Sequence, residues 1–168
     1  DEDESANWWE TQLRSLPGVS QIAIKTGRLA IIGTTPRFDN GTIVQKAMEQ
    51  TYPTKRAELI AHAVAGADVG RLFTPQGPWL SHQLYKEMQA ASGNLSELME
   101  GLIAFQNSQI EFLLNYSYPD RDIENALATH KVPVIKYLGN LSHMLEQGVI
   151  ENWEQLLDLD SQFIESNA

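Results

Sequence analysis

An apolar stripe with helical spacing opens the chain and predicts a helix over residues 5–16. Its members recur at steps of three and four, and they are Trp8, Trp9, Leu13 and Leu16. Ser5 stands where a helix N-cap is expected, and the pair Pro17–Gly18 ends the helix. Because Trp8 and Trp9 are adjacent, a helix directs them to different sides, so one is expected inside and the other at a surface.

The period of the pattern then changes from helical to strand-like. Apolar runs predict strands at residues 19–24 and 29–32, joined by a tight hairpin in which Gly27 takes a positive φ. After a polar loop, Asn40 or Thr42 can cap a helix that ends before Pro53. Residues 5–52 therefore predict an α-β-β-α unit, which we assign with the N-terminal tail to a first domain over residues 1–53.

From residue 54 onward the pattern predicts helices alone, so residues 54–168 are assigned to a helical bundle and the fold class is mainly α. The expected helices cover residues 55–67, 79–91, 94–112, 119–131, 134–147 and 149–165. Asn94 and Glu97 resemble a capping box, and Pro133 is expected to separate two helices. Residues 66–78 are rich in Gly and Pro and predict a long loop. A heptad seam follows Asn94, with members Leu95, Leu98, Leu102, Phe105, Gln109 and Phe112.

Charge is unevenly distributed along the chain. The 168 residues carry a net charge of −10, from five acids and no base in residues 1–10, a net of +4 in residues 11–92, and a net of −9 in residues 93–168. Such a balance argues against binding to duplex nucleic acid, which needs clustered Lys and Arg. There is no cysteine, which excludes disulfides and thiolate chemistry, and no apolar run is long enough to span a membrane.

Few residues indicate catalysis, and we expect no cofactor. Nucleotide-binding and nucleophile-elbow motifs are absent from the sequence. The enzyme alternative is a metal-assisted hydrolase that uses Glu58 and His62 on one helix with His143 and Glu146 on another. A second alternative is an inhibitor whose acidic face imitates nucleic acid.

The favoured hypothesis is a non-catalytic binding or assembly protein. Trp8 or Trp9 would supply an aromatic contact, and an acidic bundle face with Glu151, Glu154 and Asp158 would dock a basic protein partner. The basic-then-acidic layout also permits self-association into a homo-oligomer. Within the 66–78 loop, Arg71 and Phe73 are the candidate contact residues. The chain does not begin with Met, so a processed secreted or envelope form is one hypothesis for its localisation.

Overall fold

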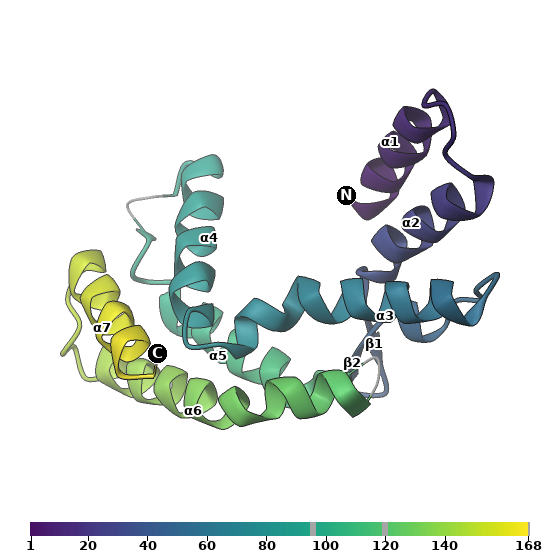
Figure 1. Ribbon diagram of the computed structural model, residues 1–168. Helices are drawn as coiled ribbons and strands as arrows, with labels where there is room; N and C mark the ends of the chain where they lie inside the picture. The colour runs from purple at the N-terminus through teal and green to yellow at the C-terminus, as the bar shows by residue number, and fades with distance from the viewer. Residues whose placement is uncertain (95–96, 119–120, 168) are drawn as a thin grey trace. The chain divides into compact units, whose positions relative to one another are not determined.

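The computed structural model describes residues 1–94, 97–118 and 121–167 (Figure 1). These residues form seven α-helices, two short strands and two 3-10 helices, which confirms the predicted mainly-α class. The chain divides into two compact units. Unit 1 consists of Asp1–Val69 and Asn115–Ala126, and unit 2 of Gly70–Leu114 and Leu127–Ala168. The positions Leu95 and Pro119, which the sequence assigned to helices, lie outside the described residues.

Two helices begin unit 1, where one helix and a strand hairpin were predicted. Helix α1 spans Glu2–Arg14 and is capped by Asp1, not by Ser5, since the Glu4 N–H donates to Asp1 Oδ1 at 2.9 Å. Helix α2 spans Gln21–Gly33, so the two predicted strands over residues 19–32 are wrong. Short apolar runs do not distinguish strand from buried helix. Here the Ser20 cap, which accepts from the Ala23 N–H at 3.1 Å, and packing along α1 favour the helix.

The strands of unit 1 lie further along the chain than predicted. Strand β1, Pro36–Asp39, pairs antiparallel with β2, Thr42–Gln45. Asn40 and Gly41 form the turn with φ values of 49° and 82°. A two-residue hairpin turn requires this left-handed backbone, and Asn-Gly is its commonest sequence. The predicted helix from Asn40 or Thr42 is therefore wrong, and only a short 3-10 helix, η1 (Lys46–Met48), follows β2. The order is α-α-β-β, not α-β-β-α.

A buried glutamine holds the interior of unit 1 together. Gln45 is fully buried, and its Oε1 accepts a hydrogen bond of 2.6 Å from the Tyr116 hydroxyl. Its Nε2 donates to the Thr34 carbonyl at 3.2 Å. Helix α3, Lys55–Gly70, contributes the buried alanines Ala57, Ala61 and Ala65. These small side chains allow other elements to approach its backbone closely.

The remaining elements are η2 (Arg71–Phe73), α4 (Gly77–Ala91), α5 (Leu102–Asn115), α6 (Arg121–Glu146) and α7 (Trp153–Ser166). Helices fill most of the predicted stretches, but several predicted boundaries are wrong, among them the start of the last helix, which lies at Trp153 and not at residue 149. Residues 66–78 are mostly helical, because α3 extends to Gly70 and α4 begins at Gly77. The helix expected from residue 94 begins as α5 at Leu102, and the two residues directly after Asn94 lie outside the described ones. Pro133 lies inside α6, where burial of Val134, Leu138 and Leu141 favours one continuous helix over a break.

The core of unit 2 is built from α4–α7, and its buried members are Tyr85, Leu98, Leu102, Leu141, Ile150, Trp153 and Leu156. The heptad seam is therefore used within the fold: Leu98 and Leu102 are buried, and Phe105 packs against them. Gly148, with φ of 67°, ends α6 as predicted. None of the described helices combines the length and apolar character that crossing a membrane requires.

Candidate binding groove

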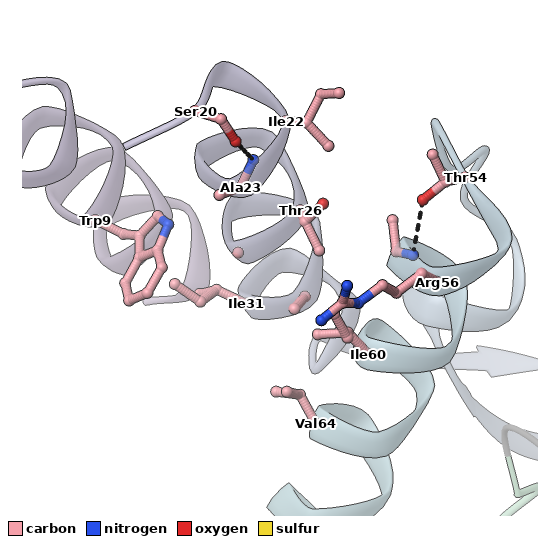
Figure 2. A pocket seen from close by; sticks show the side chains of 13 residues that line it. Trp9, Ser20, Ile22, Ala23, Thr26, Ile31, Thr54, Arg56, Ile60 and Val64 are labelled. Carbon is pink, nitrogen blue, oxygen red and sulfur yellow. Dashed lines mark hydrogen bonds between the residues drawn. The ribbon is translucent and has the colours of Figure 1, made fainter. Parts of the chain in front are cut away.

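A cavity of about 590 Å³ lies within unit 1, walled by α1, α2 and α3 (Figure 2). Helix α2 supplies two rows of side chains at a spacing of four residues, Ile22, Thr26 and Ala30 in one and Ala23, Gly27 and Ile31 in the other. Helix α3 supplies Arg56, Ile60 and Val64 at the same spacing. Together these residues of α2 and α3 line most of the hollow.

Trp9 forms the α1 wall of the groove. Its indole packs so closely on α2 that a Cβ added to Gly27 would lie 2.4 Å from Trp9 Nε1. Gly27 is thus required for close approach and not for a hairpin turn with positive φ. The Trp9 N–H is buried and has no hydrogen-bond partner among the described residues. Of the two adjacent tryptophans, Trp9 therefore serves to fix α1 against α2.

Several apolar side chains of the groove are open to solvent. Ile22 is 59% exposed, Ile60 40% and Val64 38%. Single exposed apolar residues are ordinary, but these three line one cavity. A contiguous apolar hollow on a protein surface is typical of a binding site.

Arg56 is the charged residue of the groove. Its guanidinium extends from α3 towards α2, into the space beside Ile60 and Ile31 (Figure 2). Within the described part of the chain it makes no ion pair, and no carboxylate lines the cavity. The groove therefore combines apolar walls with one unpaired cation, which suits an apolar group that carries a carboxylate.

Trp8 lies beside the groove and faces solvent. It is 65% exposed, as one of the two tryptophans was predicted to be. With Glu4, Ser5, Trp9 and Ile31 it lines a second, open hollow of about 460 Å³. Because Trp9 and Ile31 line both hollows, Trp8 and the groove belong to one surface of unit 1.

The acidic residues proposed for partner contact lie on the surface of unit 2. Glu151, Glu154 and Asp158 are all exposed, and Asp158 borders a small hollow of about 250 Å³ beside α7. A role for this face in binding stays a prediction. Of the two residues proposed in the 66–78 segment, Arg71 is exposed, whereas Phe73 is fully buried beneath Lys131.

The proposed metal ligands each have a protein neighbour of their own. Glu58 pairs with Lys55 at 2.9 Å, and His62 Nε2 lies 3.2 Å from the Ala47 carbonyl. The exposed His143 and Glu146 approach each other only to 4.0 Å. Residues 1–94, 97–118 and 121–167 contain no cluster of three or more potential ligands. The metal-assisted hydrolase stays a prediction without support from the geometry.

A buried polar network in unit 2 was not predicted from the sequence. His82 Nδ1 and Asp160 Oδ2 are 2.7 Å apart, and both side chains are fully buried. The Tyr137 hydroxyl donates to Asp160 Oδ1 at 2.9 Å. On the other side of the imidazole, Gln106 Nε2 lies 3.2 Å from His82 Nε2, and Ser142 donates to Gln106 Oε1 at 3.0 Å.

Both nitrogens of the imidazole have a partner. The Gln106 amide nitrogen faces His82 Nε2, and His82 Nδ1 can donate a hydrogen bond to Asp160 Oδ2. Burial, with the nearby Asp160 carboxylate, strongly raises the pKa of the Tyr137 hydroxyl. An Asp–His pair can orient a catalytic base, but His82 has no exposed surface and Gln106 occupies its second nitrogen. The arrangement therefore serves stability.

One sequence signal could have revealed this network. Asp160 lies on the apolar stripe of the last helix, four residues after Leu156 and four before Ile164. A carboxylate at a core position needs a buried partner, and His82 provides it. The groove left no comparable signal, because its walls come from three helices whose pairing the sequence does not show.

Comparison of the sequence with protein-family models and with curated proteins, and of the structure with solved structures, gave no match.

Proposed function

We propose that the protein is a non-catalytic binding protein that receives a protein partner in the groove of unit 1. The observation that carries this proposal is the exposure of Ile22, Ile60 and Val64 around one apolar cavity. These side chains expose apolar surface to water. A partner that covers this surface would gain about 25 cal/mol of binding free energy for each Å² buried. Trp8, beside the cavity, adds the residue type most enriched among interface hot spots.

The groove differs from the acidic surface that the sequence favoured. Its lining in the described residues holds an arginine and no carboxylate, so the matching partner surface is apolar with negative charge, not basic. The acidic face of α7 stays a separate hypothesis for a basic partner. An inhibitor that imitates nucleic acid would act through that acidic face, and nothing in the groove supports it.

The test is site-specific photo-crosslinking in extracts of the source cells. A photoreactive side chain replaces Ile60 in the groove, and a control protein carries it at Leu84, an exposed residue of α4. We expect a discrete protein adduct from position 60 alone, and its loss when Val64→Glu places a charge in the cavity. Equal labelling from both positions, or adducts that persist in the Val64→Glu protein, would contradict the proposal.

A further inference from the structure

We infer that the partner in the groove is a second copy of this chain, whose α1 inserts Trp8 into the cavity and brings Glu4 to Arg56. This inference rests on the proposed function, since it names the partner that the groove binds. It follows from two complementary features that unit 1 carries on one surface, an exposed aromatic group beside a carboxylate and an apolar hollow beside an unpaired cation.

The exposed aromatic group is Trp8. At 65% exposure, most of its indole is in water, although its neighbour Trp9 is packed against α2. A tryptophan can bury roughly 150–250 Å² in a contact. The cavity of about 590 Å³ lies within the range of roughly 300–1,000 Å³ that ligand pockets span. It can therefore take an indole together with part of the helix backbone that bears it.

Charge complementarity indicates how α1 of the second copy is oriented in the groove. Glu4 lies one helical turn before Trp8, so both side chains lie on the same face of α1. The Glu4 side chain is 85% exposed, and its ion pair with the Asp1 amino group, at 3.3 Å, is too exposed to hold it firmly. Arg56 has no carboxylate partner in the described residues. A carboxylate from a second copy would complete a charge-assisted hydrogen bond at the edge of the cavity.

The layout of the surface permits a closed dimer. Trp9 and Ile31 line both the hollow around Trp8 and the groove, so the inserting group and its receptor are neighbours. Each copy therefore carries both the inserting tryptophan and the groove that receives it. In a dimer with a two-fold axis, each copy inserts its Trp8 into the groove of the other. We therefore expect a dimer and not an open chain of copies.

The experiment is sedimentation equilibrium of the full chain and its variants over a wide concentration range. The wild-type protein should dimerise, and Trp8→Ala should raise the dissociation constant by about 30-fold or more, as loss of a hot spot does. Glu4→Arg or Arg56→Glu alone should raise it by about tenfold through like-charge contact. The double variant Glu4→Arg/Arg56→Glu should restore dimerisation, which a merely misfolded protein would not do.

Control substitutions outside the groove test whether the change in dissociation constant is specific to the groove. Lys136→Glu and Leu84→Ala change an exposed cation and an exposed apolar residue of unit 2, and they should leave the dissociation constant unchanged. A wild-type chain that stays monomeric at millimolar concentration would overturn the inference. So would a Glu4→Arg/Arg56→Glu variant that dimerises no more tightly than either single variant. If a monomeric chain still gave a specific adduct from Ile60 with a different protein, only the identity of the partner would be wrong. A monomeric chain that gives no adduct from position 60 would contradict the proposed function as well.

Discussion

The indole of Trp9 lies against Gly27 with no room for a side chain, since an added Cβ would come within 2.4 Å of Nε1. This contact joins α1 to α2 at one wall of the groove. The nearest atoms belong to a ring that is itself packed, so a methyl group at position 27 must displace Trp9.

Gly27→Ala should therefore destabilise unit 1, by about 1–3 kcal/mol as overpacked sites do. The matched control is Gly139→Ala in α6, where a Cβ would meet no atom within 4 Å. That change should stabilise the protein by about 0.5–1 kcal/mol, because alanine is the better helix former. Urea unfolding followed by circular dichroism measures both, and equal effects of the two substitutions would refute the close packing of Trp9.

The buried pair of His82 and Asp160 should be a major source of stability in unit 2. Asp160→Ala leaves the His82 Nδ1 proton and the Tyr137 hydroxyl without their acceptor. Each buried donor left without a hydrogen-bond partner costs about 1–3 kcal/mol. Asp158→Ala, on the exposed side of the same helix, should change stability by less than about 0.5 kcal/mol. A similar loss in the two variants, measured by denaturant unfolding, would show that the network is not needed.

Alkaline pH should destabilise the fold through its tyrosines. Burial raises the pKa of all five, Tyr52, Tyr85, Tyr116, Tyr118 and Tyr137, above the ordinary value of 10.0. The unfolded chain loses these protons near pH 10 while the folded chain keeps them. Stability is therefore full below pH 10 and falls as pH rises through the folded pKa values. The largest contributions should come from Tyr116 and Tyr137, whose pKa values burial raises most.

Tyr137→Phe isolates one of these contributions. Phenylalanine cannot ionise, so the unfolding free energy of the variant should fall less steeply above pH 10 than that of the wild type, by about 1.4 kcal/mol per pH unit. At neutral pH the variant should be less stable by about 0.5–1.5 kcal/mol, because the hydrogen bond to Asp160 is lost. Parallel pH profiles for the two proteins would contradict the raised pKa of Tyr137.

The sequence predicted well where one local signal decides the structure. Gly148 ends α6, and the buried Trp153 and Leu156 lie on the predicted face of α7, while α1 ends at Arg14, shortly before the predicted stop at Pro17–Gly18. It failed where two local signals compete. Residues 19–32 alternate like strands, yet contact with α1 makes them helical, and the Asn40–Gly41 hairpin turn was interpreted as a helix start. Such choices depend on partners that are distant in the chain.

The candidate site could be predicted only in part. An exposed tryptophan at position 8 or 9 followed from helix geometry, because adjacent residues cannot share a face. The groove did not follow, since its walls come from three helices whose pairing the sequence does not show, with Trp9 on α1, Ile22 on α2 and Ile60 on α3. Likewise, the predicted heptad seam is covered within unit 2, where Leu98 and Leu102 are buried.

The most direct measurement of the central claim is fluorine NMR of the protein labelled with 5-fluorotryptophan, whose four resonances report Trp8, Trp9, Trp79 and Trp153 separately once single Trp→Phe variants assign them. If Trp8 enters the groove of a second copy, raising the protein concentration should shift the resonances of Trp8 and Trp9 and leave that of Trp153 in place. Glu4→Arg should abolish the shift, and Glu4→Arg/Arg56→Glu should restore it. Four resonances that do not change with concentration would contradict the account.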